Sequence, residues 1–353
     1  MKRFFLSIAM ALLVLGCGSD NAYDGETGLI GSASAGGETA TFLKQINNNV
    51  LIKNSVLQVQ RADVAKNAIA ELSQEQSSAN LQAAQQQATL FFNTWKRVEA
   101  LYVAKKYNDT MIDHPSQIDY FNIGKGSLTS KLDNIYASKF ALQDLLFQSS
   151  TRSTTALEYT LFGNQEGLDV NMTQRRADAA MVMIEYLIEK SDVIAEFYKS
   201  SSAFVNSSEE SVGIMINQLI DSTYKLKEWR IGDAAGYTQN YKDKPDASRY
   251  EYYKSFNTRA SIVEILSAQL EMMQEGLESI ASQNAAANEA KAIIDLIKDA
   301  INQINNMSGL LESNPVTDET KTLYATVNAL QNSYSSLISA LNFQQDIIEA
   351  DGD

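Results

Sequence analysis

Histidine, cysteine and proline are scarce in this chain of 353 residues, which contains one His, one Cys and three Pro. A single Cys excludes intramolecular disulfides and Cys-rich zinc or iron–sulfur clusters, because each of these needs several thiolates. A single His excludes the H-E-x-x-H motif and every other site that needs two imidazoles. Much catalytic metal chemistry is therefore ruled out by composition alone.

Basic residues are outnumbered as well, with 29 Lys and Arg against 43 Asp and Glu and a net charge of −14. A chain this acidic repels phosphate backbones, so we expect no nucleic-acid partner. Carboxylate oxygens are the only metal ligands present in number, and they suit hard cations such as iron or calcium.

The N-terminus has the pattern of a secretory signal. Lys2 and Arg3 precede an apolar run over residues 4–15, which is too short to cross about 30 Å of hydrocarbon as a helix. The run ends in Val14-Leu15-Gly16-Cys17, which resembles a bacterial lipobox. That resemblance implies a signal peptide over residues 1–16 and lipid attachment at Cys17. The alternative is an ordinary secretory signal that happens to contain a Cys.

Lipid on Cys17 would attach the protein to a membrane, since each buried methylene contributes about 0.8 kcal/mol. Gly18 follows the Cys where envelope lipoproteins retained at the inner membrane have Asp, which favours the outer membrane. We therefore expect a periplasm-facing lipoprotein of the bacterial cell envelope. Residues 17–37 contain much Gly, Ser and Asp and too little apolar surface to fold, so we expect a flexible tether there.

The rest of the chain predicts an all-α protein. Residues 81–102 repeat apolar side chains at steps of three and four, and similar segments follow at 179–197, 253–282, 288–312 and 318–348. No window alternates with period two between hairpin turns. We expect two helical bundles, over residues 38–205 and 206–353, with Gly163 ending one helix and Thr317 beginning another.

Two carboxylates interrupt the apolar pattern. Glu99 lies on or beside the stripe of residues 81–102, and Glu158 lies between Leu157 and Leu161. A carboxylate in such a place must be paired, protonated or bound to a cation, because an unpaired buried charge costs several kcal/mol. Glu99 at the edge of its stripe and in contact with water is the alternative.

The stretch STTALEYTLFG, residues 153–163, resembles the G-x-H-x-x-E motif of the imelysin-like (peptidase M75) family of envelope proteins. Glu158 matches the motif's Glu, whereas Ser153 stands at its Gly and Thr155 at its His. Trp95–Tyr102 and Ile118–Phe121, which include Glu99 and Asp119, resemble two further family segments. The resemblance implies a fold of two helical bundles and a link to metallopeptidase activity or to iron acquisition.

Thr155 supplies only a neutral hydroxyl where the motif has an imidazole, so the sequence favours binding over catalysis. One hypothesis is that Glu99, Asp119 and Glu158, with Tyr102 or Tyr159, form an oxygen-rich site for a cation such as iron or calcium, or for another ligand. A second is that Glu158 is structural and hydrogen-bonds a neighbouring helix or pairs with Arg97 or Arg230. Metallopeptidase activity, or a cleft between the bundles that receives an envelope protein partner, are the remaining alternatives.

Overall fold

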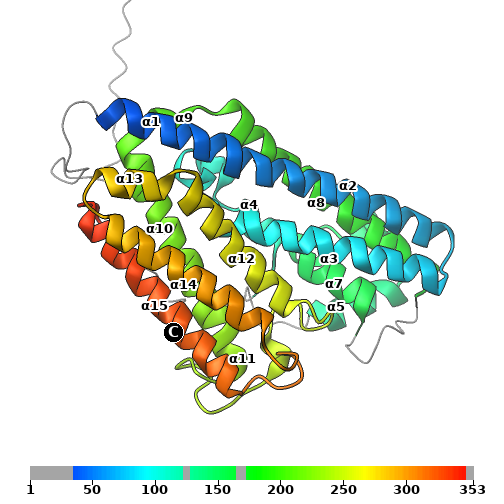
Figure 1. The fold of residues 1–353 in the computed structure, drawn as a ribbon. Coiled ribbons are helices and arrows are strands. Elements are labelled where there is room, and N and C mark those ends of the chain that lie inside the picture. Colours follow the sequence, from blue (N-terminus) through cyan, green and yellow to red (C-terminus); the bar gives the residue numbers. More distant parts are fainter. Residues whose placement is uncertain (1–34, 122–127, 164–171, 347–353) are drawn as a thin grey trace, which may run out of the picture.

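A computed structural model describes residues 35–121, 128–163 and 172–346, and within these ranges every regular element is helical (Figure 1). The all-α prediction is confirmed. The predicted signal peptide, Cys17 and the predicted tether up to residue 34 lie outside the described residues. The first helix, α1, begins at Ala35.

The first bundle is built on a predicted amphipathic stripe. Its main helices are α2 (Lys53–Gln74), α3 (Ser78–Ala100), α7 (Thr154–Phe162) and α8 (Gln174–Ser200). α2 packs against α3 and α8, and α7 contacts both α3 and α8. The apolar face of α3 lies in the core, with the rings of Phe91, Phe92 and Trp95 fully buried.

The second bundle consists of α10 (Ser208–Lys227), α12 (Thr258–Met272), α14 (Ala287–Asn305) and α15 (Asp318–Ala340). α15 packs against α10 and α14, and α12 packs against α14 on one side and α3 of the first bundle on the other. α1 (Ala35–Ile46) lies on the second bundle and continues through η1 (Asn47–Ile52) into α2, so one helical run spans both bundles (Figure 1).

Shorter helices complete the described chain. They are η2 (Ala104–Lys106), η3 (Asp109–Met111), α4 (His114–Ile118), α5 (Leu128–Ala137), α6 (Leu142–Leu145), η4 (Ser149–Arg152), α9 (Ala203–Asn206), η5 (Glu228–Gly232), α11 (Asp233–Ala235), η6 (Ala247–Arg249), η7 (Met273–Leu277) and α13 (Glu278–Gln283).

Local signals fix the helix ends as predicted. Gly163 ends α7 with φ +70°, a left-handed conformation that Gly adopts without strain, and Thr317 caps α15 by accepting a hydrogen bond from the Thr320 amide at 3.0 Å. Ser153 begins α7 by accepting a hydrogen bond from the Ala156 amide at 3.2 Å. The residue at the motif's Gly position is thus a helix N-cap.

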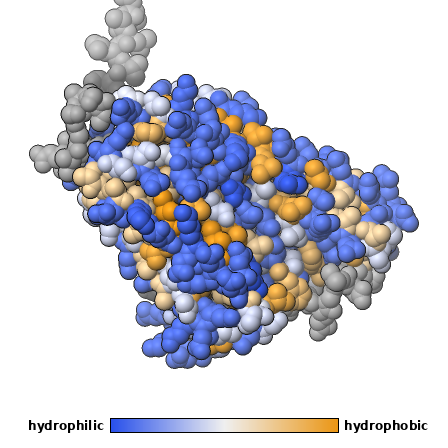
Figure 2. Space-filling model, in the orientation of Figure 1, coloured by the Kyte–Doolittle hydropathy of each residue, from blue (hydrophilic) through white to orange (hydrophobic). Residues whose placement is uncertain are grey.

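The face of the molecule in Figure 2 is mostly hydrophilic, with small apolar areas scattered between the helices. None of the helices in the described ranges is both long and apolar enough to cross a membrane.

The π-helical segment η5 continues α10 and carries Trp229 and Arg230. Gly232 closes this segment in a tight space: a Cβ atom there would lie 2.7 Å from Thr238 Cγ2, 3.0 Å from the Lys227 carbonyl oxygen and 3.0 Å from Tyr324 Cε2. A side chain at this position would displace η5 from α15.

We expect Gly232→Ala to lower the free energy of unfolding by about 1–3 kcal/mol, the usual range for overpacking. Gly309→Ala is the matched control, because a Cβ there meets nothing within 4 Å. Urea denaturation of the two variants checks the prediction, which fails if both lose the same stability.

Candidate functional site

A fully buried lysine lies where α3 meets the second bundle. The Lys96 side chain has no exposed surface, and its ammonium nitrogen contacts Glu99 Oε2 at 2.7 Å, Asp119 Oδ2 and Glu251 Oε1. A lone ammonium this deep would be strongly unfavourable, so the three carboxylates are what allows it to be charged.

Arg230 adds a second cation from η5. Its Nη2 donates to Glu99 Oε2 at 2.9 Å and its Nε donates to Glu251 Oε2 at 2.6 Å. Lys96, Glu99, Asp119, Arg230 and Glu251 form what we call the charge cluster. Both cations bridge Glu99 and Glu251, so the cluster joins α3 of the first bundle to the second.

Asp119 is held in place by neutral donors as well. It follows α4 directly, and its Oδ1 accepts from the Phe121 amide at 2.9 Å and from Thr155 Oγ1 at 3.2 Å. The indole Nε1 of Trp95 donates to the other oxygen, Oδ2, at 3.2 Å. Thr155, at the motif's His position, therefore contacts the charge cluster through a hydroxyl group.

A bent loop before α12 delivers Glu251 to the cluster. Tyr252 and Phe256 both have positive φ, 58° and 54°, which costs roughly 1–2 kcal/mol for each non-Gly residue. The Tyr252 ring stacks on Phe92 with centroids 5.0 Å apart and planes 6° from parallel. This aromatic contact and the ion pairs of Glu251 hold the loop in its strained conformation.

The ionisation of the cluster follows from burial and charge together. Burial alone would lower the pKa of Lys96, but the charges of Asp119, Glu251 and Glu99 raise it above its usual value. Burial works against ionisation of Asp119 and Glu99 too, yet their cationic neighbours hold both pKa values below the usual range. Complete burial raises the pKa of Glu251 to about 7, although Arg230 and Lys96 oppose this. Glu251 is thus the first of the three carboxylates to take up a proton.

The structure brings two of the three predicted site carboxylates together. Glu99 and Asp119 share Lys96, whereas Glu158 points to the loop before α12, where its Oε1 accepts from the Ser255 amide at 2.9 Å and from Ser255 Oγ at 2.7 Å. Burial raises the pKa of Glu158 to about 7, although the hydrogen bonds of Ser255 oppose this.

The arginines that were expected near Glu158 and the tyrosines that were expected near the predicted site carboxylates make other contacts. Arg97 pairs with Glu264 and Glu271, and Arg230 pairs with Glu99 and Glu251, so neither arginine pairs with Glu158. The hydroxyl groups of the two tyrosines also have other acceptors: Tyr102 donates to the Met111 carbonyl at 2.8 Å and Tyr159 to Asp133 at 2.6 Å.

Lys96, Arg230 and Glu251 were not among the predicted site residues. The sequence does indicate Lys96 as a partner of Glu99, since it precedes Glu99 by three residues on the same helix and follows the core residue Trp95. No sequence pattern indicates Glu251, because it lies 155 residues along the chain from Lys96 and only the packing of α12 on α3 brings the two together.

The carboxylates of Glu99, Asp119 and Glu251 have the geometry of a cation site, with one oxygen from each within 4.8 Å of the others. The ammonium of Lys96, however, contacts all three carboxylates. A metal ion could approach them only if Lys96 moved away. The residues present therefore fit an internal ammonium ion and do not fit a metal.

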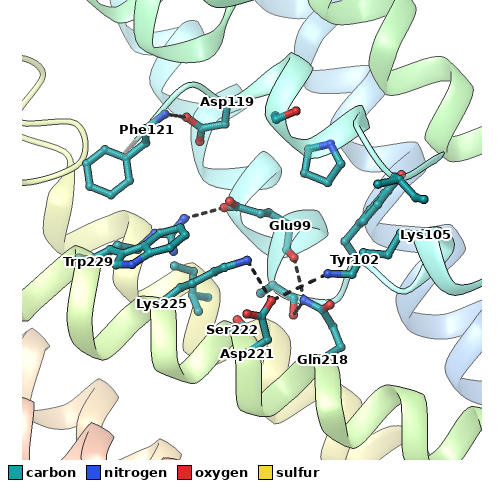
Figure 3. Close-up of a pocket in the computed structure, with 16 residues that line it drawn as sticks. Glu99, Tyr102, Lys105, Asp119, Phe121, Gln218, Asp221, Ser222, Lys225 and Trp229 are labelled. Carbon is teal, nitrogen blue, oxygen red and sulfur yellow. Dashed lines mark hydrogen bonds and ion pairs between the residues drawn. The ribbon is translucent and has the colours of Figure 1, made fainter. Parts of the chain in front are cut away.

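A cavity of about 210 Å³ lies beside the charge cluster, between α4 and the end of α3 on one side and α10 and η5 on the other. Glu99 and Asp119 reach it from one side, and Gln218, Asp221 and Ser222 from the other (Figure 3). Lys105 and Lys225 approach Asp221 from different sides, with nitrogen–oxygen distances of 4.0 Å and 2.9 Å. Aromatic and aliphatic side chains line the rest, among them Tyr102, Phe121, Trp229 and Ile265.

Comparisons with known proteins agree with this fold. The family model for imelysin (peptidase M75) matches residues 56–340. The crystal structure of an imelysin-like protein from Psychrobacter arcticum 273-4 has a TM-score of 0.75 and 17% identity, and the alignment covers 90% of this chain and 99% of that one. A protein from Parabacteroides distasonis ATCC 8503, provisionally named an iron-regulated protein A precursor, has a TM-score of 0.70 and 13% identity, with coverage of 86% and 95%. No curated protein matches the chain.

If the Lys96 ammonium occupies the position that a metal ion would take, Lys96→Ala should lower the free energy of unfolding by about 3–5 kcal/mol, since it leaves buried carboxylates without their central partner. Millimolar Ca²⁺ should then raise the melting temperature of the variant and leave that of the natural chain unchanged. Lys53→Ala is the control, because that lysine is 59% exposed and its ion pair contributes at most about 1 kcal/mol. An equal response of both proteins to Ca²⁺ would contradict the interpretation.

Glu158 should make stability depend on pH. Its pKa rises from 4.5 to about 7 on folding, so the folded chain holds a proton that the unfolded chain releases between these values. Its stabilising contribution is complete below pH 4.5 and is lost as pH rises through 7, a change of about 3 kcal/mol. Urea denaturation from pH 5 to pH 8 should show a smaller decline for Glu158→Gln than for the natural chain. The exposed Glu209→Gln variant is the control and should follow the natural curve.

Proposed function

This chain belongs to the imelysin family, and we propose that it is a binding protein that holds a small solute in the cavity beside its charge cluster. The observation that carries the proposal is the position of Lys96, whose ammonium group engages the three carboxylates that a metal would need. With those oxygens engaged and Thr155 at the motif's His position, the adjoining cavity is the part of the site that is open to a ligand.

The size and lining of the cavity support a small polar solute. Its volume of about 210 Å³ is below the roughly 300–1,000 Å³ of sites for drug-sized molecules, and it exceeds the ~150 Å³ that accommodates benzene. Charged groups of both signs and several rings line it, a combination that orients a ligand through a few polar contacts while burying its apolar part.

We further propose that the protein acts at the bacterial cell envelope, attached by lipid on Cys17 and facing the periplasm, in the outer membrane. The support is the lipobox-like Val14-Leu15-Gly16-Cys17 and the Gly at position 18. The name of the Parabacteroides distasonis protein refers to iron regulation. We do not propose iron binding for this chain, because bare iron would compete with Lys96 for the same carboxylates.

A cavity-blocking variant tests the proposal. Ser116 on α4 lines the cavity and is exposed, so Ser116→Trp should fill the cavity without disturbing the core. Melting temperatures would be measured with amino acids, monosaccharides and dicarboxylates, and with Fe³⁺, Ca²⁺, Mg²⁺, Mn²⁺ and Zn²⁺. We expect an organic solute to raise the melting temperature of the natural chain and to leave that of Ser116→Trp unchanged. At a solute concentration of 100 times Kd, binding stabilises the natural chain by about 2.7 kcal/mol.

The exposed Ser336→Trp on α15 is the matched control and should keep the response. A shift with metal ions alone would instead support the cation hypothesis. The absence of any shift, or a shift that Ser116→Trp retains, would overturn the proposal and favour a role as an interaction protein.

A further inference from the structure

Two charged groups of opposite sign face the cavity with hydrogen-bonding capacity to spare. Glu99 uses its Oε2 atom for both Lys96 and Arg230, and its other oxygen, Oε1, has no hydrogen bond to any described residue. The Glu99 side chain is 23% exposed and lines the cavity. A carboxylate oxygen that faces a cavity in this way accepts a hydrogen bond from a ligand that carries N–H donors.

The second group is the ammonium of Lys105, which belongs to η2. Its nearest anion, Asp221, is 4.0 Å away and is already bound by Lys225 at 2.9 Å. Two ammonium groups thus share one carboxylate on this side of the cavity. Burial, together with the charge of Lys225, lowers the pKa of Lys105. A ligand carboxylate would supply the missing negative charge.

Apolar surface completes the lining. Trp229 and Phe121 present aromatic rings and Ile265 an aliphatic side chain to the same cavity. The Lys225 ammonium lies 5.2 Å from the centre of the Trp229 ring, and the Arg230 guanidinium 5.8 Å from that of Phe121, so cations from the surrounding structure already engage both rings. The remaining ring surface suits an apolar group.

From this arrangement we propose that the cavity binds a free amino acid with an apolar side chain. The ligand's ammonium group contacts Glu99, its carboxylate contacts Lys105 and Lys225, and its side chain lies against Trp229. The inference rests on the proposed function, since it names the solute class for the same cavity. A ligand with only one charge would leave either Glu99 Oε1 or the Lys105 ammonium desolvated without a hydrogen-bond partner, which is why a zwitterion is preferred.

Isothermal titration calorimetry with three related probes tests the proposal. L-phenylalanine has both charges, phenethylamine lacks the carboxylate and 3-phenylpropanoate lacks the ammonium group. We expect L-phenylalanine to bind the natural chain at least about tenfold more tightly than either analogue. Equal affinities for the three probes would overturn the assignment.

Two variants assign each charge to its partner. Glu99→Gln should weaken L-phenylalanine and phenethylamine about tenfold and leave 3-phenylpropanoate unchanged, and Lys105→Met should weaken L-phenylalanine and 3-phenylpropanoate and leave phenethylamine unchanged. Lys106→Met is the control, because that neighbouring lysine pairs with Asp346 at 3.0 Å and does not line the cavity. If Glu99→Gln fails to fold, the affinities of the three probes for the natural chain still show whether binding requires both charges of the ligand.

The two proposals can fail separately. If no probe binds but another solute shifts the melting temperature and Ser116→Trp abolishes that shift, the amino-acid assignment is wrong and the binding function stands. If no solute shifts the melting temperature of the natural chain, or if Ser116→Trp keeps every shift, both the binding function and the amino-acid assignment are wrong.

Discussion

The structure depends most on the enclosure of one ammonium group by three carboxylates. Lys96 is completely buried, and charge burial of this kind is tolerated only when every partner is in place. Those partners come from α3 itself, from the residue after α4 and from the loop before α12, and Arg230 of η5 ties two of them together. One interaction therefore fixes the relative positions of four segments and the packing of α12 on α3.

The enclosure of Lys96 also accounts for the contacts of Thr155 and Glu158, the two residues at the His and Glu positions of the family motif. Thr155 supports Asp119 through its hydroxyl, and Glu158 binds Ser255 in the loop that delivers Glu251. Both motif positions thus serve the architecture around the charge cluster. Two cations and three carboxylates hold one another in fixed positions, so the cluster provides a rigid polar wall beside the cavity.

Much of the fold could be predicted from local patterns. The stripe in residues 81–102 places Phe91, Phe92 and Trp95 in the core, and Gly163 and Thr317 end and begin helices for reasons that lie within a few residues of each. The candidate site could be predicted only in part. Glu99 and Asp119 could be picked out as carboxylates near apolar or motif positions. The same pattern picked out Glu158, which contacts Ser255 and not Lys96. The burial of a carboxylate does not by itself indicate which group it pairs with.

Composition and patterns within a few residues are enough to predict the helices, the ends at Gly163 and Thr317, the family resemblance and the shortage of imidazoles and thiols. The enclosure of a lysine by the carboxylates could not be predicted in this way, because Lys96 and Glu251 are 155 residues apart and meet through helix packing. The same holds for the π-helical η5 that brings Arg230 to the cluster and for the cavity between Glu99 and Lys105. Interactions between distant segments depend on how whole helices pack, which no short stretch of sequence specifies.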